Sequence, residues 1–333
     1  MRPPACAEVE PQRWDEVLHA AGVTDVYYSR GFVAASAALV HAEPVLLRLS
    51  GEAGDVFLAC LVRGDPTDVV TPYGYGGPVA AGDDPPLARF PAAYEAWCER
   101  RGVVSTFLVF HPLLANADSP ASAGYHRTPL AGTVAWELAG DDLLPAMHKH
   151  HRRMVRRALA AGYDVAIAAE PSDLEEFAAL YEQTMRRAGA SEFYFFPREY
   201  WDALRAGVQL VRVDVRDGDG ALLAGVLGMG EPPWLHYHLG GATDAARGTG
   251  ASHLALYSLA EWGQEHGYAT LHLGGGVGGR HDSLLEFKLR FAPGGIKRVA
   301  IGKAVHDRAA YARLTGSETV DWDGFFPAYR EPY

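Results

Sequence analysis

Apolar residues gather in short runs along the second half of the chain. Residues 210–216 and 221–230 form two such runs joined by the sequence DGDG, and residues 235–242 form a third. Runs of this length that end at glycine or aspartate are typical of β-strands, and the DGDG stretch predicts a hairpin turn. The sequence therefore predicts three successive strands, of which the first two pair in antiparallel fashion.

Helical patterns flank these strands. Residues 171–189 predict a helix that begins at Ser172 or Asp173, whose side chains suit an N-cap, and residues 198–204 predict a second, short helix. After the third strand, residues 251–267 predict another helix and residues 269–276 a last strand. The order in this half is two helices, antiparallel strands, one helix and one strand.

The first half of the chain repeats this order. The predicted elements are helices at 13–22 and 30–41, strands at 44–50 and 55–63, a helix at 87–101, and strands at 105–110 and 133–138. The repetition predicts an α/β (α+β) fold class with two tandem domains, each a mixed sheet flanked by helices. We place these domains at residues 1–140 and 141–298, with the junction at the Gly-Asp-Asp sequence around Asp141. The strand-like residues 298–305 predict that the segment 299–333 returns to the first domain.

Composition agrees with this organisation. The chain has 333 residues, of which 48% are hydrophobic and 21% charged, so it is long enough for two separate cores. Its N-terminus lacks the basic start and apolar stretch of a secretory signal, and it has no apolar run of about 18 residues. Three widely spaced cysteines form no CxxC pair and suggest no disulfide framework. We expect a cytoplasmic protein without an integral membrane segment.

Charge is distributed unevenly. The net charge of −11 opposes the coating of nucleic acid by electrostatics alone, so we expect no DNA partner. Residues 148–157, HKHHRRMVRR, nevertheless concentrate basic side chains in one predicted helix. This helix either presents a solvated basic face at a domain junction or binds an anion, and the sequence alone leaves both interpretations open.

A glycine-containing loop precedes the helix at 251–267. In the sequence Arg247-Gly248-Thr249-Gly250 the loop opens directly into the helix, where free backbone N–H groups and the positive end of the helix dipole suit a phosphate or an oxyanion. The pattern is neither a Walker A loop nor a GxGxxG sequence. The alternative is a turn that merely allows the helix and its neighbouring strand to pack closely.

Several motifs in order carry a family resemblance. They are TPYGYGGP (71–78), FHPLL (110–114), the basic helix ending in RRMVRRALAAGYDV, and LGGG followed by DSLLEFKLRF up to residue 291. Together they resemble the Fem-type (FemABX) aminoacyltransferases over residues 26–298. The resemblance implies a tandem of GNAT-like domains, in which the loop from Arg247 to Gly250 matches the acyl-CoA loop of the GNAT superfamily, while Ser252 departs from its last position. It also implies transfer of an amino acid from aminoacyl-tRNA to an amine, without a cofactor.

Lys288 is the leading catalytic candidate. Ser283 and Glu286 have the spacing of a capping box, which predicts a helix start just before Lys288, with Asp282 beside it. Aminolysis of an ester passes through a tetrahedral oxyanion that an ammonium group stabilises. The resemblance matches Phe287 and Lys288 to the Phe-Lys pair at the catalytic channel of the family. The alternative is a lysine that extends from an apolar helix to solvent.

The remaining candidates depend on the resemblance. Tyr237 is expected to contact the acceptor or the reacting ester, Tyr73 and Tyr75 to line the acceptor groove, and Tyr200 to bind the acceptor. His111 is either the base for the attacking amine or a structural His-Pro turn. His236 and His238 alternate with Tyr237, and because no third ligand follows at motif spacing we expect no metal site there.

The last expectations concern the donor, the acceptor and two alternative functions. The basic residues Arg152, Arg153, Arg156 and Arg157 are expected to bind tRNA, and the acceptor is expected to be an amine on a small peptide or on a cell-wall or antibiotic precursor. Two other functions share the fold: an acetyl-CoA-dependent N-acetyltransferase and a non-catalytic GNAT-like module that binds a ligand without turnover. The sequence does not specify the transferred amino acid or the oligomeric state.

Overall fold

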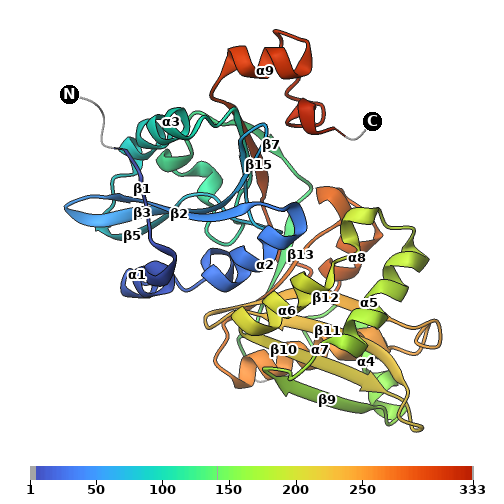
Figure 1. Ribbon diagram of the computed structural model, residues 1–333. Coiled ribbons are helices and arrows are strands. Elements are labelled where there is room, and N and C mark those ends of the chain that lie inside the picture. Colours follow the sequence, from blue (N-terminus) through green and yellow to red (C-terminus); the bar gives the residue numbers. More distant parts are fainter. Residues whose placement is uncertain (1–4, 141, 332–333) are drawn as a thin grey trace. The chain divides into compact units, whose positions relative to one another are not determined.

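The computed structural model describes residues 5–140 and 142–331, so Asp141 at the expected junction lies outside the described residues. The chain divides into two compact units (Figure 1). The first unit contains residues 1–130 and 298–333, and the second contains residues 131–297. Each unit has a mixed sheet with helices against it, so the predicted α/β fold class is confirmed.

The second unit is built on a seven-stranded sheet in the order β14-β8-β13-β12-β11-β10-β9. Its strands are β8 (Thr133–Glu137), β9 (Asp164–Ala169), β10 (Leu210–Arg216), β11 (Leu222–Met229), β12 (Trp234–Ala242), β13 (Thr270–Gly275) and β14 (Ile296–Lys297). Its helices are α4 (Lys149–Ala160), α5 (Glu175–Ala188), α6 (Arg198–Gly207), α7 (Ala251–Glu265) and α8 (Ser283–Leu289). Strands β12 and β13 are parallel, and α7 connects them along the chain. The other neighbouring strands of this sheet are antiparallel.

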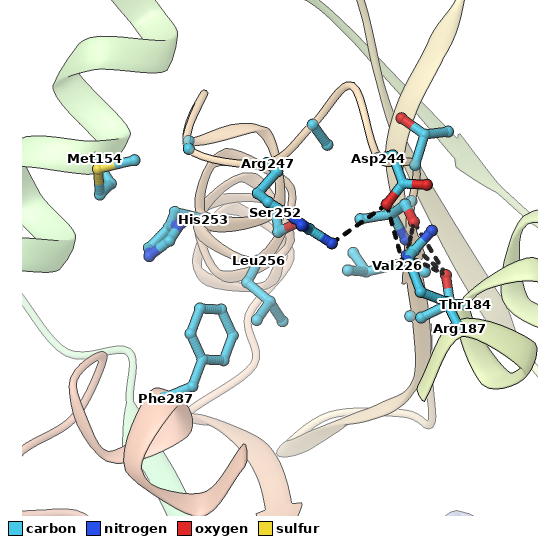
Figure 2. Close-up of a pocket in the computed structure, with 18 of the residues that line it drawn as sticks. Met154, Thr184, Arg187, Val226, Asp244, Arg247, Ser252, His253, Leu256 and Phe287 are labelled. Carbon is cyan, nitrogen blue, oxygen red and sulfur yellow. Dashed lines mark hydrogen bonds and ion pairs between the residues drawn. The ribbon is translucent and has the colours of Figure 1, made fainter. Parts of the chain in front are cut away.

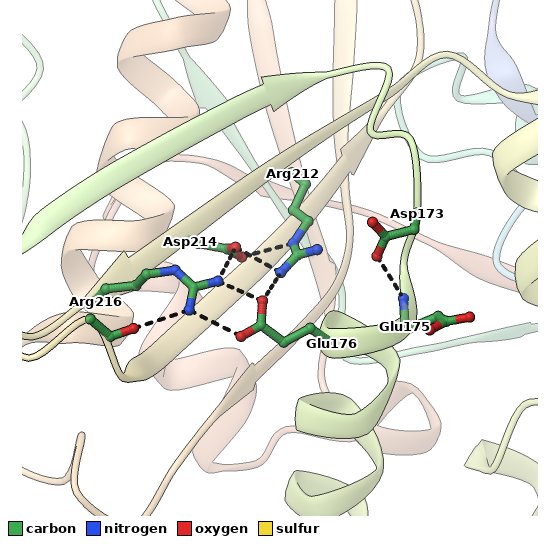
Figure 3. Close-up of polar contacts among 7 residues, drawn as sticks. Asp173, Glu175, Glu176, Arg212, Asp214 and Arg216 are labelled. Carbon is green, nitrogen blue, oxygen red and sulfur yellow. Dashed lines mark hydrogen bonds and ion pairs between the residues drawn. The ribbon is translucent and has the colours of Figure 1, made fainter.

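Strand β10 shows how the two faces of this sheet differ. Val211, Val213 and Val215 are buried in a core that also contains residues of α4 and α7. The intervening residues face α5, because successive side chains of a strand point to opposite faces. There Arg212 lies 2.7 Å from Asp214 and 2.9 Å from Glu176 at the start of α5 (Figure 3). An apolar core thus holds α4 and α7, and an ion-pair network anchors the first turn of α5.

The first unit has an eight-stranded sheet in the order β1-β2-β3-β4-β6-β15-β7, with β5 paired to β3. Its strands are β1 (Ala7–Glu8), β2 (Glu43–Ser50), β3 (Ala53–Arg63), β4 (Asp68–Val70), β5 (Val79–Asp84), β6 (Ser105–Val109), β7 (His126–Pro129) and β15 (Ala300–Val305). Its helices are α1 (Trp14–Ala20), α2 (Arg30–Val40), α3 (Phe90–Arg101) and α9 (Arg308–Thr315). Strands β4 and β6 are parallel, and α3 connects β5 to β6.

Two strands lie near the borders between the units, and their pairing shows to which sheet each border segment belongs. Strand β8 pairs with β13 and β14 and so belongs to the sheet of the second unit, although the sequence expectation places residues 133–138 in the first domain. Strand β15 pairs with β6 and β7 in the sheet of the first unit. Across residues 5–140 and 142–331, none of the helices has both the length and the apolar character that a membrane crossing requires.

Candidate functional site

The start of α7 forms one side of a cavity in the second unit. Gly250 is the N-cap of α7 and has a φ of 97°, which favours glycine. A Cβ atom at Gly250 would lie 2.3 Å from the carbonyl oxygen of Met154 in α4. The glycine therefore allows α4 and α7 to pack closely, and the start of α7 lines the cavity at Gly250, Ser252 and His253.

The cavity has a volume of about 690 Å³ and lies between α4, α5, α7, α8 and the end of β12. Figure 2 shows side chains from these elements around it, with Phe287 below α7 and Arg187 on the opposite wall. Tyr237, Arg247, Gly250 and Phe287 all line this cavity, as does Arg157 of the basic helix. The structure thus brings together five of the site residues predicted from sequence.

The charged side chains that line the cavity are those of Arg157, Arg187, Arg247 and Asp244. Arg157 is exposed, and Arg247 is 80% exposed with its guanidinium 3.3 Å from the carboxylate of Asp244. Arg187 donates a hydrogen bond to the carbonyl oxygen of Ala242 at the end of β12 (Figure 2). Asp244 also lies 3.6 Å from Arg187, so three guanidinium groups face one carboxylate, and this excess of positive charge together with the helix N-terminus suits an anionic ligand.

The glycine-rich segment before α8 fixes the position of Lys288. Helix α8 begins at Ser283, but its N-cap is Asp282, whose carboxylate accepts hydrogen bonds from the N–H groups of Leu285 (2.9 Å) and Val277 (2.8 Å). The predicted capping box from Ser283 to Glu286 was therefore wrong. Asp282 takes this place because one carboxylate caps the helix and also closes the preceding loop at the positive end of the helix.

Lys288 is buried, with 7% of its surface exposed. Its Nζ atom donates a hydrogen bond to the carbonyl oxygen of Gly275 (2.7 Å) and lies 5.5 Å from the centre of the Tyr237 ring. Burial lowers the pKa of Lys288 to about 7, while the nearby Asp282 carboxylate acts in the opposite direction. Near neutral pH this amine therefore exists in both charged and neutral forms.

Tyr237 reaches the cavity from an irregular part of the sheet. Leu227 of β11 pairs with Leu239, whereas the next residue, Gly228, pairs with Tyr237, so β12 contains one extra residue, His238. Such a bulge redirects side chains locally. Burial raises the pKa of Tyr237 to about 12, so its hydroxyl stays protonated at neutral pH. The neutral phenol of Tyr237, which lines the cavity, therefore lies next to the buried, titratable amine of Lys288.

Other predicted residues lie elsewhere. The Tyr200 hydroxyl lies 2.5 Å from Nε2 of His238, on α6 and β12. His236 contacts His272, with 3.2 Å between their Nδ1 atoms. Tyr200 and these histidines do not line the cavity described above.

His111, Tyr73 and Tyr75 belong to the first unit. His111 is fully buried, accepts a hydrogen bond at Nδ1 from the N–H of Leu114 (3.3 Å), and has Nε2 3.3 Å from the carboxylate of Asp25. The Tyr75 ring lies 6.1 Å from the His111 ring, and Tyr73 is partly buried. These contacts fit the structural alternative for His111, in which the imidazole organises the loop after β6.

The four arginines of α4 differ in exposure. Arg153, Arg156 and Arg157 are exposed, whereas Arg152 is partly buried and donates a hydrogen bond to the carbonyl oxygen of Pro145 (2.8 Å). The opposite face of α4 packs into the core through Val155 and Ala158. The helix is thus amphipathic, with a basic outer face that reaches the cavity at Arg157.

Sequence reasoning missed two groups at the cavity. Thr184 and Arg187 come from the last turns of α5, and no motif marks them as site residues. His150, His151 and His253 form a cluster, although about a hundred residues separate the first two from the third. Only the packing of α4 against α7 brings these histidines together, so spacing along the chain gave no signal.

Comparison with known proteins identifies this fold. Residues 146–288 match the family model described as an acetyltransferase (GNAT) domain. No curated protein sequence matches the chain significantly. The matched region contains α4, the cavity and α8 up to Lys288, which are the parts that build the candidate site.

Solved structures resemble the chain over nearly its whole length. FemX has a TM-score of 0.65 at 14% identity, over 94% of this chain and 100% of FemX. L-PGS from Bacillus licheniformis has a TM-score of 0.60 at 14% identity, over 89% of this chain and 92% of that protein. A tandem GNAT protein from the clavulanic acid biosynthesis pathway has a TM-score of 0.56 at 13% identity, over 91% of this chain and 98% of its own. The tandem GNAT-like fold and the resemblance in fold to FemX are confirmed, and the domain match supports an acyltransferase.

Proposed function

We propose that this protein is an aminoacyltransferase that moves an amino acid from aminoacyl-tRNA to an amine and forms an amide bond. The observation that carries the proposal is the position of Lys288, a buried amine whose Nζ atom lies 5.5 Å from the ring centre of Tyr237, a residue that lines the cavity. The fold shared with FemX and L-PGS supports acyl transfer in general. The choice of donor depends on the basic face of α4.

The proposed reaction needs no redox partner. The neutral amine of the acceptor attacks the ester carbonyl carbon, and a tetrahedral intermediate with a negative oxygen forms. The C–O bond to the ribose then breaks, the acceptor nitrogen loses its proton, and the ribose oxygen leaves as a hydroxyl. The protein must bind both substrates in line and stabilise the negative oxygen, which are the main contributions in such reactions.

Lys288 is the residue that we assign to the oxyanion. In its ammonium form Nζ has three donors, of which one is used by the carbonyl oxygen of Gly275. Burial strengthens the interaction of the other donors with a developing negative charge, because the surroundings have a low dielectric constant. We assign the neutral hydroxyl of Tyr237 as a second donor to the oxyanion.

The cavity is assigned to the acceptor end of the donor. A single-stranded RNA end can be held through its phosphates and hydroxyls without base readout. Arg157, Arg187 and Arg247 provide the charges, and the exposed arginines of α4 extend them along the helix. Binding through so small a patch on a chain of net charge −11 is expected to be modest and sensitive to salt.

The acceptor amine is proposed to be an α-amine on a peptide or on a cell-wall or antibiotic precursor. An α-amine has an ordinary pKa of about 7.7–8.0, against about 10.4 for a lysine side chain, so it is partly neutral at cell pH. A strong dedicated base is then unnecessary. This fits a site in which His111 has a structural role, with its Nε2 atom 3.3 Å from Asp25.

The decisive test is transfer of a labelled amino acid to amine acceptors in the presence of charged tRNA. We expect product only with charged tRNA, and none after treatment with ribonuclease. Charge reversal at Arg152, Arg153, Arg156 and Arg157 is expected to raise the apparent KM for tRNA more than it lowers the maximal rate. Product formation that survives ribonuclease would contradict the proposed donor.

A second candidate is an acetyl-CoA-dependent N-acetyltransferase. It is favoured by the match of residues 146–288 to an acetyltransferase (GNAT) domain and by the anion-binding start of α7. Efficient acetylation in ribonuclease-treated reactions would replace the first proposal by this one. Ligand binding without transfer from either donor would instead indicate a non-catalytic module.

A further inference from the structure

Three histidines meet where α4 packs against α7. His150 and His151 lie in the first turn of α4, and His253 lies in the first turn of α7. One ring nitrogen from each of them lies within 4.8 Å of the others, and the Nδ1 atoms of His150 and His151 are 3.4 Å apart. Three imidazoles at this spacing are one short of a tetrahedral coordination shell.

The hydrogen bond of His151 determines which of its nitrogens is available. Nε2 of His151 lies 2.9 Å from the carbonyl oxygen of Phe287, which can only accept, so Nε2 carries the proton. In the neutral ring Nδ1 then has a lone pair, and this atom faces His150. Histidines that bind metals commonly donate their other N–H to a backbone carbonyl, which fixes the tautomer and the ring orientation.

His253 contributes an unsatisfied polar atom. Its Nε2 is buried and has no hydrogen-bond partner among the residues that the structure describes. Its ring packs edge-on against His151, with 4.4 Å between ring centres, and against Phe287 at 5.1 Å. A buried nitrogen without a partner is costly and calls for an explanation, and a bound ion is one of those known for such atoms.

We propose that His150, His151 and His253 bind a divalent transition-metal ion such as Zn²⁺, with one coordination position open toward the cavity. A tetrahedral ion with Zn–N bonds of about 2.0–2.1 Å holds its nitrogens about 3.3 Å apart. The His150–His151 pair already has this spacing, at 3.4 Å. The most distant pair lies within 4.8 Å, so the distance between its two nitrogens would have to decrease by up to about 1.5 Å when the ion binds.

Nearby charges restrict the fourth coordination position. Arg153 and Arg290 lie close enough to act on the histidine rings and would repel a dication. An anionic fourth ligand would offset that repulsion.

The location gives the ion a role in ligand binding. His150 and His253 both line the cavity, together with Arg157 and Arg247. A phosphate or carboxylate in the cavity would be the anion within reach of the open position. This inference does not depend on the identity of the acyl donor, because the ligands come from the protein alone.

The test uses the full chain without an affinity tag, stripped of metal by a chelator and titrated with Co²⁺ as a spectroscopic probe for Zn²⁺. We expect one Co²⁺ per chain, with the intense visible absorption of a four-coordinate site, and displacement by one equivalent of Zn²⁺. His253→Gln and His150→Gln are expected to weaken Co²⁺ binding at least tenfold. His266→Gln, an exposed histidine on the same unit, is expected to bind Co²⁺ as the unchanged chain does.

Two outcomes would overturn the proposal. One is the lack of saturable Co²⁺ binding by the unchanged chain, and the other is equal binding by the unchanged chain and both cluster variants. Circular dichroism before each titration separates loss of ligands from loss of fold, and His150→Gln serves as the second variant because His150 is less buried than His151. If one cluster variant unfolds, Co²⁺ binding by the other variant still tests the proposal.

Discussion

The two units place a helix at the same point of their topology but begin it differently. Helix α7 follows β12 and leads to β13, which is parallel to β12, and α3 lies between β5 and β6, of which β6 is parallel to β4. The loop before α7 contains Arg247 and Gly250, whereas the residues before α3 are Gly-Asp-Asp-Pro-Pro, followed by a short 3-10 helix. Exposed carboxylates and a proline in the first turn of α3 oppose anion binding. Of these two helix starts, that of α7 is therefore the one that we propose as an anion site.

A buried lysine in each unit extends the comparison. Lys303 of β15 is 3% exposed, and its Nζ donates hydrogen bonds to the carbonyl oxygens of Trp322 (2.5 Å) and Gly324 (3.1 Å). Lys288 has one carbonyl partner and an aromatic ring. Lys303 therefore ties a C-terminal loop to its strand, whereas Lys288 is the lysine that we propose to donate to a ligand. The difference shows that burial of a lysine does not by itself indicate catalysis.

The largest expected effect is on turnover, and it distinguishes Lys288 from Lys303. Lys288→Met is expected to lower turnover by more than tenfold, and by as much as about 10²–10³, which is typical for loss of one oxyanion-stabilising donor. Lys303→Met is the matched control, because it removes a buried amine of the first unit. We expect it to lower thermal stability while turnover of the folded fraction stays within about twofold. Steady-state rates together with melting curves test both variants, and equal losses of turnover would remove the distinction.

The second largest expected effect is on the pH dependence of the maximal rate. Burial lowers the pKa of Lys288 to about 7, so its ammonium fraction falls by about tenfold per pH unit above that value. If the ammonium stabilises the oxyanion, the maximal rate falls as the pH rises above 7, once the loss of ammonium exceeds the gain in neutral acceptor amine. The residual activity of Lys288→Met should lack this alkaline decrease. A wild-type rate that only rises between pH 6 and 9 would instead assign the neutral amine of Lys288 as a base.

The sequence was sufficient for the fold but not for all of the site. The order of apolar runs and helical patterns predicted two α/β domains because periodicity reports which faces are buried. The Arg247–Gly250 loop and Lys288 could be proposed as site residues because glycine loops and helix starts have local signatures. The cluster of His150, His151 and His253 could not be found in this way, because it exists only through contacts between distant helices. The cap of α8 was misassigned for a related reason, since the second hydrogen bond of Asp282 goes to Val277 across the loop.

A smaller effect tests whether the loop before α7 needs its glycine. Gly250→Ala places a Cβ atom 2.3 Å from the carbonyl oxygen of Met154 in addition to the strain of a left-handed backbone. Gly248→Ala has similar backbone strain, with a φ of 72°, but no atom within 4 Å of the added Cβ. We expect urea unfolding to show a loss of about 2–5 kcal/mol for Gly250→Ala and about 1–2 kcal/mol for Gly248→Ala. Equal losses would mean that the contact between α4 and α7 relaxes freely.

The smallest expected effect distinguishes two adjacent arginines of α4. Arg156 and Arg157 are both exposed, but only Arg157 lines the cavity, so a phosphate held there is expected to contact Arg157. Arg157→Ala should raise the KM for the RNA donor a few-fold and reduce the dependence of log KM on log salt concentration by about 0.7–1, because one phosphate contact is lost. Arg156→Ala should change both quantities less, since its charge acts only from the outer face. Measurement of KM at several salt concentrations distinguishes the two arginines. A larger change for Arg156→Ala would place the RNA along the outer face of α4 and leave the cavity to a different ligand.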